Sequence, residues 1–220
     1  MTTGHIPWTV SVRDRTLIVS LPEEYRVLSW APLQGGFSIA RSFLNHQVRT
    51  DEYPSEEPGP FLLALARRLG VAEPTVGLMT GVVMERLVRR VIRRDALLLE
   101  CFATVGVSNA LAVGDAATYE EKPGTINIIT LVNQPLTDAA LIEAVGIVTE
   151  AKTRALLEAK IRSTVSDSPA TGTGTDCVAV GSPGGTPAFR YCGKHTVLGE
   201  LLGRVTYGAI VEGLRRAHNT

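Results

Sequence analysis

The chain has 220 residues, and its 22 lysine and arginine side chains are balanced by 22 aspartate and glutamate side chains. This length suits one large domain or two small ones, and the balanced charge provides no overall field that would attract nucleic acid or an anionic membrane surface. Hydrophobic residues make up 45% of the chain and aromatic residues only 5%, so the core must be mainly aliphatic, and the apolar surplus leaves room for a homo-oligomer interface.

The cysteines and the N-terminal residues indicate the cellular compartment in which the protein is expected. Cys101, Cys177 and Cys192 are odd in number and widely spaced, without a Cys-x-x-Cys pair, which argues against a disulfide framework or a zinc knuckle. The first residues lack the basic segment and apolar core of a secretory signal, and no later run approaches the roughly 20 apolar residues of a membrane span. We therefore expect a cytoplasmic protein with neither a membrane nor a nucleic-acid partner.

The N-terminal part of the chain is predicted to begin with strands. Apolar and polar residues alternate on both sides of Arg13-Asp14-Arg15, which is typical of a half-buried hairpin. After Gly35-Gly36 the apolar spacing is helical, so we expect a helix or turn that presents Asn45 and His46 at its C-terminal end. The predicted elements are a hairpin region over residues 1–34, with strands at 8–12, 17–21 and 26–30, and a helix at 37–46.

The middle of the chain is predicted to alternate loops, helices and strands. Prolines and acidic residues crowd into residues 51–60 and predict an exposed loop, and Gly70 ends the helix that follows it. The arginine-rich residues 84–94 are compatible with a short helix or with a loop and a strand. The remaining predictions are a helix at 61–69, a short strand at 75–80, a buried strand at 96–107 and a central strand at 125–132, almost wholly apolar apart from Asn127.

A long predicted helix over residues 138–161, capped by Thr137, carries two charges in unexpected places. At about 100° per residue, Lys152 falls in the middle of an apolar face, and Glu150 lies near apolar residues on the opposite side. A charge inside an apolar stripe must be paired or have a perturbed pKa, so both residues are candidates to support a site. The alternative is that Lys152 extends to the helix edge and Glu150 forms an ordinary salt bridge.

The last third of the chain completes the predicted fold. Gly199 and Gly203 lie one turn apart on the final helix and predict a close backbone contact there. The predicted elements are a polar loop at 163–175, a strand at 176–180, a turn at 182–187, a returning strand at 189–192 and a helix at 196–217. Together they predict a single domain over residues 1–220 of the α/β or α+β class, with a mixed or antiparallel sheet covered by long helices.

The strongest candidate for a functional site is the loop Thr171-Gly172-Thr173-Gly174-Thr175-Asp176. Its glycines suggest a backbone that takes unusual dihedrals or lets another group approach closely. A phosphate-binding role is disfavoured because the loop precedes a strand, whereas phosphate loops run from strand to helix. Hydrolysis is better provided for: His195 is a candidate base, Asp176 orients it or a water, and Lys194 stabilises an oxyanion with the loop hydroxyls and amides.

Several alternatives remain open at this point. His195 is otherwise an ordinary residue at a helix start, and His46, preceded by Asn45, is a second candidate. Direct attack by a loop threonine or a cysteine stays open although no G-x-S-x-G elbow is present, and packing is the favoured role of the cysteines. The two histidines and Asp176 lack the local spacing typical of a metal site, so no metal is predicted.

Five segments, in this order, resemble the adenosylcobinamide amidohydrolase (CbiZ-type) family, and the resemblance runs from about Gly35 to the end of the chain. They are Asn45-His46, GTINI at 124–128, TEAKT at 149–153, TGTGTD at 171–176 and GKHTVLGELLG at 193–203. The resemblance implies hydrolysis of the amide that joins the aminopropanol arm to the corrin ring's propionate in adenosylcobinamide, giving adenosylcobyric acid for cobalamin salvage. The corrinoid is then the substrate, and no cofactor is expected.

Residue chemistry, within this resemblance, assigns the roles. Asp176 and His195 are expected in the catalytic centre, with His46 converging from the N-terminal half and with Glu150 and Lys152 orienting them. The expected substrate contacts are Asn45, Thr171, Gly172, Thr173, Gly174, Thr175, Lys194 and Thr196. The competing interpretations are a non-catalytic corrinoid or small-molecule binding protein and an amidohydrolase of the same architecture that acts on another amide.

Overall fold

A mixed sheet of eight strands organises the structure, a computed structural model that describes residues 6–49, 57–117 and 124–218. The strand order is β4-β3-β2-β10-β8-β6-β5, and β1 pairs with β2 beside this path. β3 runs parallel to β4 and β8 parallel to β10, whereas the other pairs are antiparallel. The strands are β1 (Thr9–Arg13), β2 (Thr16–Ser29), β3 (Gly36–Gln47), β4 (Thr75–Thr80), β5 (Val88–Arg94), β6 (Leu97–Val105), β8 (Ile126–Val132) and β10 (Cys177–Pro183).

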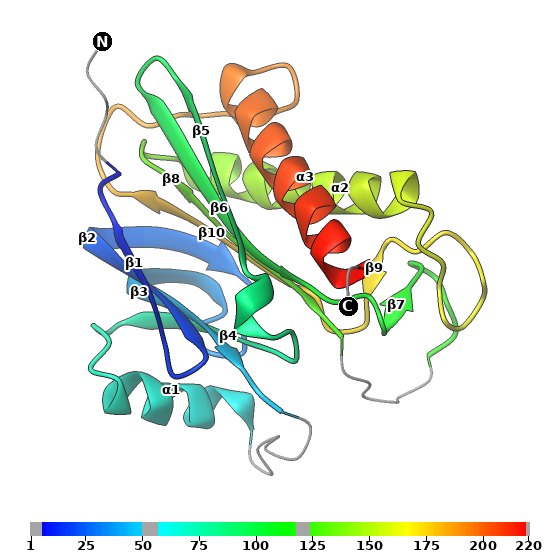
Figure 1. The fold of residues 1–220 in the computed structure, drawn as a ribbon. Helices are drawn as coiled ribbons and strands as arrows, with labels where there is room; N and C mark the ends of the chain where they lie inside the picture. Colours follow the sequence, from blue (N-terminus) through cyan, green and yellow to red (C-terminus); the bar gives the residue numbers. More distant parts are fainter. Residues whose placement is uncertain (1–5, 50–56, 118–123, 219–220) are drawn as a thin grey trace.

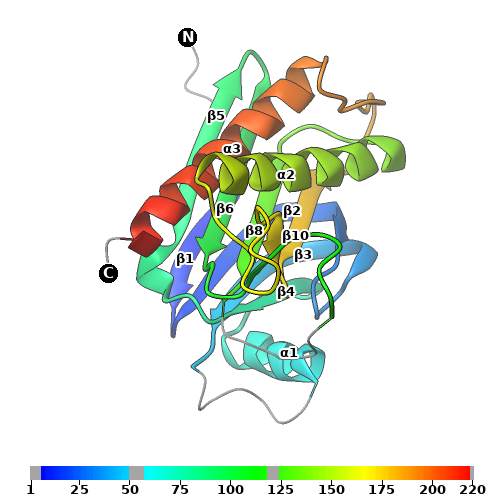
Figure 2. The same ribbon diagram turned by 90° about the vertical axis from the view of Figure 1, so that its right-hand side faces the viewer.

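In the described part of the chain, three α-helices cover the outside of the sheet. They are α1 (Pro58–Arg68), α2 (Asp138–Glu158) and α3 (Val197–His218). Figures 1 and 2 show α2 and α3 crossing together above the β10-β8-β6 part of the sheet, while α1 lies at the far end beside β3 and β4. The prediction of a mixed sheet covered by long helices is therefore confirmed. Within the described ranges, no helix combines the length and apolar character needed to cross a bilayer.

The sheet curls strongly, so that its inner face encloses a core of its own. Large side chains such as Tyr25, Phe43 and Phe102 fill this interior. β4 stands at one end of the strand order yet lies against β8, where the Asn127 side-chain amide donates a hydrogen bond of 2.8 Å to the Met79 carbonyl. The accumulated twist of a many-stranded sheet explains such curling. The outer face carries two further apolar clusters, one under α2 and α3 and one under α1.

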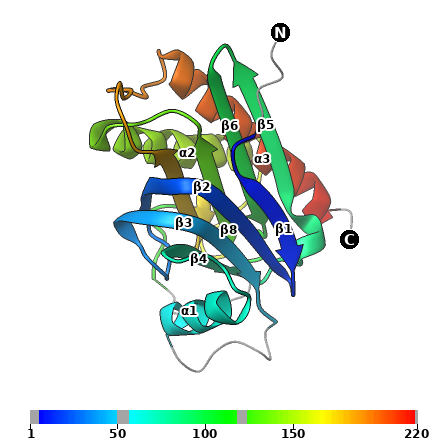
Figure 3. The same ribbon diagram turned by 90° about the vertical axis from the view of Figure 1, so that its left-hand side faces the viewer.

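Strand β2 changes its partner along its length. Its first part pairs with β1, and its last part, from Tyr25 to Ser29, pairs with β10. β3 lines the other edge of β2, with an irregularity between Ser20 and Tyr25. Figure 3 shows β1 beside the lower part of β2. Strand β10 therefore lies between the N-terminal strands and the β8-β6-β5 group.

Residues 37–46 form most of strand β3, and the predicted helix there is wrong. The second half of the strand is covered on both faces, because Phe43 points into the interior while Leu44 packs against α1. Apolar residues on both faces remove the alternation that would have indicated a strand. The arginine-rich segment resolves into a 3-10 turn at Met84–Arg86 followed by β5. The predicted returning strand at 189–192 is also wrong, since Phe189 forms an isolated bridge with Leu136.

The starts of α2 and α3 follow ordinary capping chemistry. The Thr137 hydroxyl accepts a hydrogen bond of 3.2 Å from the Ala140 amide, which confirms the predicted N-cap. The Thr196 hydroxyl likewise accepts a hydrogen bond of 3.0 Å from the Gly199 amide, so this residue, expected to contact substrate, caps α3. A β-carbon at Gly199 would overlap the carbonyl oxygens of the preceding loop, whereas one at Gly203 would make an ordinary contact of 3.8 Å. The predicted close contact therefore exists at Gly199.

These two glycines give a matched test of the helix packing. Gly199→Ala should lower the free energy of unfolding by about 1–3 kcal/mol, because the new methyl group must displace the backbone of Cys192 and Gly193. Gly203→Ala should raise it by up to about 1 kcal/mol, because alanine favours helix and has space there. Denaturant unfolding followed by circular dichroism measures both. Equal effects of the two substitutions would contradict this packing.

Candidate functional site

A buried ion pair lies where α2 crosses the beginning of β10. The Lys152 ammonium donates to Asp176 Oδ2, and the two side chains are only 7% and 8% exposed. The helix directs Lys152 toward the sheet, among the apolar residues of α2 that pack there. Each charge would be costly in this position without the other. Lys152, predicted to support the site from outside, is thus the direct partner of Asp176.

The second carboxylate oxygen of Asp176 is also held. Asp176 Oδ1 accepts a hydrogen bond of 2.5 Å from the Thr173 hydroxyl and one of 3.1 Å from the Ile126 amide. Trp30 Nε1 donates to the Asp176 backbone carbonyl at 2.6 Å. The carboxylate therefore has a fixed orientation, with a half-buried hydroxyl at contact distance on one side and an ammonium on the other.

The buried ion pair explains why residue 172 is a glycine. A β-carbon there would lie 2.7 Å from the Lys152 nitrogen and would overlap Asp176 Oδ2. Only glycine lets the loop backbone pass so close to the ion pair. The second glycine, Gly174, is exposed, and a β-carbon there would lie 3.0 Å from the Asn109 side-chain amide. The glycines thus let the loop pass close to the ion pair and to the Asn109 amide, in place of the phosphate cradle considered and disfavoured from the sequence.

Hydrogen bonds from several elements hold the loop in this conformation. Residues Gly172–Thr173 form the short strand β9, which pairs with β7 (Ala110–Leu111). The Thr171 carbonyl accepts a hydrogen bond of 3.0 Å from the Thr153 hydroxyl of α2, and the Thr171 hydroxyl accepts one of 2.8 Å from the Val113 amide. Thr171 thus has a structural role, whereas Gly174 and Thr175 are exposed at the tip.

A chain of buried polar side chains connects the sheet interior to the loop. Asn127 donates to Asn45 Oδ1 at 2.9 Å, and Asn45 donates to the Thr104 hydroxyl at 3.0 Å. The Thr125 hydroxyl lies 3.4 Å from the Asn127 side-chain oxygen and donates to the Thr175 carbonyl at 2.7 Å. Asn45, expected to contact substrate, is only 2% exposed. It supports the loop from within the sheet.

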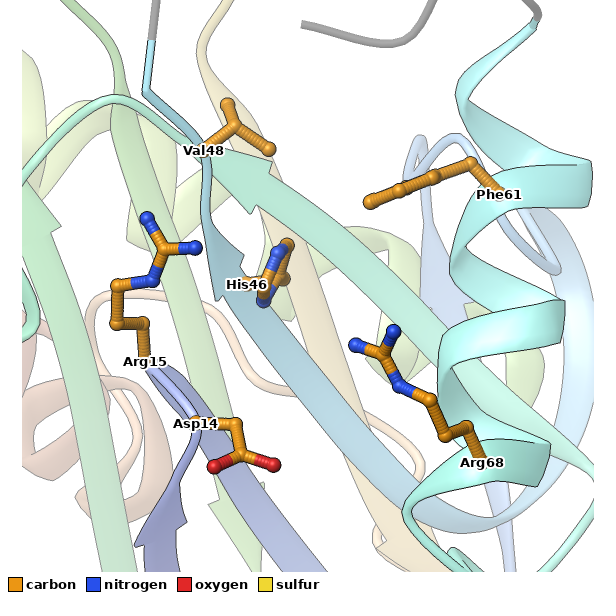
Figure 4. Close-up of a pocket in the computed structure, with 6 residues that line it drawn as sticks. All are labelled: Asp14, Arg15, His46, Val48, Phe61 and Arg68. Carbon is orange, nitrogen blue, oxygen red and sulfur yellow. The ribbon is translucent and has the colours of Figure 1, made fainter. Parts of the chain in front are cut away.

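His46 lies on the other face of β3 from Asn45, as neighbouring strand residues do. Its Nδ1 is 2.8 Å from the Thr16 hydroxyl, and its ring lies 5.7 Å from that of Phe61. It lines a cavity of about 400 Å³ between the β1-β2 turn and α1, where the Arg15 and Arg68 side chains flank it (Figure 4). His46 faces α1, whereas Asp176 faces α2. Contrary to the prediction, the structure therefore does not bring these two side chains together.

His195 is exposed at the start of α3, beside Gly193. The neighbouring Cys192 amide donates to Glu143 of α2 at 2.5 Å. The Asp176 carboxylate is held by Lys152, Thr173 and the Ile126 amide, and no hydrogen bond or ion pair joins it to His195. The predicted direct pairing of these two residues is therefore not present in the structure.

The other predicted charged residues pair with each other at the surface. Lys194 donates to both carboxylate oxygens of Glu150, at 2.7 and 2.8 Å, and both side chains are well exposed. The ordinary salt bridge considered for Glu150 is thus the correct interpretation. Exposed pairs of this kind contribute little to stability.

The cysteines are unpaired and buried, in agreement with a packing role. Burial, assisted by a nearby carboxylate in each case, raises the pKa of the Cys101, Cys177 and Cys192 thiols to about 12. Thiols with such a pKa are poor nucleophiles at neutral pH. Among the described residues, no three histidine, cysteine, aspartate or glutamate side chains gather as a metal site would require.

Sequence reasoning missed two parts of this site. Thr125 and Asn127 carry the interior polar chain, and their signal was the presence of polar side chains in an otherwise apolar central strand. Trp30 was assigned only to a strand, although a tryptophan at a strand end has a polar nitrogen that can bind a nearby carbonyl.

Comparisons with known proteins give the family. An uncharacterized protein, MJ1613, from Methanocaldococcus jannaschii is 30% identical over 241 residues, covering 95% of this chain and 91% of that protein. The adenosylcobinamide amidohydrolase of Methanosarcina mazei is 37% identical over 148 residues, covering 67% of this chain and 66% of that protein. The crystal structure of the PH0078 protein from Pyrococcus horikoshii OT3 aligns with a TM-score of 0.44 and 11% identity, over 97% of this chain and 79% of that one.

The sequence profile of one family, adenosylcobinamide amidohydrolase (CbiZ), matches residues 4–220. An amidohydrolase is by definition a hydrolase of amide carbon–nitrogen bonds. Because the match spans nearly the whole chain, the protein belongs to the adenosylcobinamide amidohydrolase family.

Proposed function

We propose that this protein hydrolyses the amide between the aminopropanol arm and the corrin-ring propionate of adenosylcobinamide. The products are free aminopropanol and adenosylcobyric acid, which can re-enter cobalamin synthesis. The family match over residues 4–220 carries the choice of substrate. The cluster of Thr173, Asp176 and Lys152 supports the reaction type, because amide hydrolysis needs an activated oxygen and a group that accepts its proton.

In this proposal Thr173 is the nucleophile. Its hydroxyl proton already points to Asp176 Oδ1 at 2.5 Å, so the oxygen lone pairs are directed away from the carboxylate. As Thr173 Oγ1 attacks the amide carbon, Asp176 takes the proton and then gives it to the departing amine. Lys152 fixes Asp176 in position, as the third member of a nucleophile–base–orienting group arrangement. Water then hydrolyses the ester and frees Thr173.

The proposed steps use neither a metal nor an organic cofactor, and the cobalt belongs to the substrate. His195 and His46 lie outside the cluster, so we assign neither a step. The exposed tip of the loop, Gly174 and Thr175, leaves an approach to Thr173 from solvent. A large substrate can therefore remain outside the fold while its amide arm reaches the cluster.

The direct test is a product assay. Purified protein incubated with adenosylcobinamide should release aminopropanol in an amount equal to the adenosylcobyric acid formed, and a chelator should not change the rate. A panel of other corrinoids and simple amides tests the alternative amide substrates. Retention of the corrinoid without aminopropanol would instead favour a binding protein, and loss of activity on chelation would contradict the metal-free steps.

Substitutions at two threonines of the loop distinguish the proposed nucleophile from a residue that only supports the loop. Thr173→Ala should lower kcat by at least about 10³-fold, because it removes the attacking oxygen, while Thr173→Ser should retain measurable turnover. Thr175→Ala is the matched control, since its exposed hydroxyl makes only a hydrogen bond of 3.5 Å to the Gly124 carbonyl. Mass spectrometry of rapidly quenched wild-type enzyme should detect the corrinoid ester on Thr173. Substantial turnover by Thr173→Ala would refute this role.

The buried pair allows stability to be separated from chemistry. Lys152→Met or Asp176→Asn alone should each cost about 3–5 kcal/mol of unfolding free energy, because each leaves one unpaired buried charge. The double variant removes both charges and should recover most of that loss, yet remain inactive because no base is left. Urea unfolding and the product assay measure the two effects. An active double variant would exclude Asp176 as the proton acceptor.

A further inference from the structure

Three large apolar side chains are exposed together beside the site. Trp30 at the end of β2 is 47% exposed, and Phe37 and Ile39 at the start of β3 are 56% and 51% exposed. Single exposed apolar residues are ordinary, whereas a group on one face requires an explanation. We call these three residues the apolar shelf.

Strand register places the shelf on one continuous surface. Phe37 pairs with Leu28 and Ile39 with Arg26, so each pair points to the same side of the sheet. Trp30 directly follows β2, two residues after Leu28, and its hydrogen bond to the Asp176 carbonyl places it at the same end of the strand, beside the loop before β10. The side shared by these pairs is the outer face that α2 partly covers, because Arg26 donates to the Leu136 carbonyl just before α2. The apolar shelf is the neighbouring part of the outer face, along β2 and β3. Figure 3 shows these two strands side by side.

Trp30 attaches the shelf to the reactive cluster. Its indole Nε1 donates to the Asp176 carbonyl at 2.6 Å, which holds one edge of the ring against the loop. Nearly half of the side chain remains open to solvent. A flat ligand resting on this ring would therefore lie next to the loop that carries Thr173 and Asp176, within reach of a flexible side arm.

We propose that the apolar shelf binds one flat face of the macrocycle of the substrate, with Trp30 as the main contact. This inference rests on the proposed function, since it specifies where the ring of a corrinoid sits while its amide arm enters the cluster. A large conjugated ring offers a broad, weakly hydrated face, and stacking on an aromatic side chain is its natural recognition. On an open surface the amides at the edge of the ring stay in contact with water. An open shelf therefore suits this ring better than a closed cavity would.

The test compares binding with turnover in variants of exposed residues. Trp30→Ala should raise the KM for adenosylcobinamide about tenfold or more, and Phe37→Ala should raise KM by a smaller factor with kcat changed less than about threefold. Val12→Ala is the matched control, because Val12 is 52% exposed on β1, which pairs with the other end of β2. Trp30→Phe keeps an aromatic face without the hydrogen bond to Asp176 and should lie between wild type and Trp30→Ala.

Equilibrium dialysis makes the result independent of catalysis. Adenosylcobyric acid, measured by its visible absorbance, should bind wild type and Val12→Ala equally and Trp30→Ala about tenfold more weakly. If Trp30→Ala and Phe37→Ala both leave KM and binding unchanged, the apolar shelf does not bind the macrocycle, even if the wild-type protein is active. If wild type releases no aminopropanol, the proposed function fails, and dialysis with intact adenosylcobinamide still decides whether the shelf binds the ring. Circular dichroism spectra confirm that the variants are folded.

Discussion

A lysine ammonium buried beneath a helix requires an opposite charge at contact distance, and Asp176 provides it for Lys152. This requirement determines much of the neighbouring structure. The loop before β10 must pass close enough to deliver Asp176, so a glycine stands where a methyl group would collide with the pair. Thr173 then completes the coordination of the carboxylate. A pair that needs such exact surroundings also holds its neighbours in a fixed geometry, which suits a reactive centre.

The interior polar chain supports the loop from the other side. Asn45, Asn127 and Thr125 are buried polar side chains beside a largely aliphatic and aromatic core, and each is satisfied by hydrogen bonds. Buried polar networks of this kind favour one arrangement over alternatives, because a slipped register would leave several groups unpaired. The curl of the sheet makes the network feasible, since it brings β3 and β4 against β8. The loop is therefore positioned by both the helix layer and the sheet interior.

Much of the fold could be predicted from local patterns, and the errors have physical causes. The cap at Thr137, the long helices and the charge of Lys152 inside an apolar stripe all report local chemistry, so the sequence carries them directly. Strand β3 was misread because both faces of its second half are covered, which removes the alternation on which strand prediction depends. The expected pairing of Asp176 with His195 failed because the sequence indicates a strand after Asp176 but not which side chain Asp176 meets, and that side chain is Lys152 of α2. The role of Trp30 depends on strand register, which no local pattern encodes.

Strand β10 has a consequence for how the chain reaches this structure. Among the described strands, the ladder that joins β1–β4 to β5, β6 and β8 passes through β10, which begins only at residue 177. During synthesis, the two groups of strands must therefore wait, each with an open edge, until the last fifth of the chain emerges. Contacts of such long sequence separation slow folding and expose edges that can pair wrongly. Because Asp176 directly precedes β10, the same late event that joins the sheet also brings the carboxylate to Lys152, and a partly folded chain has no assembled site.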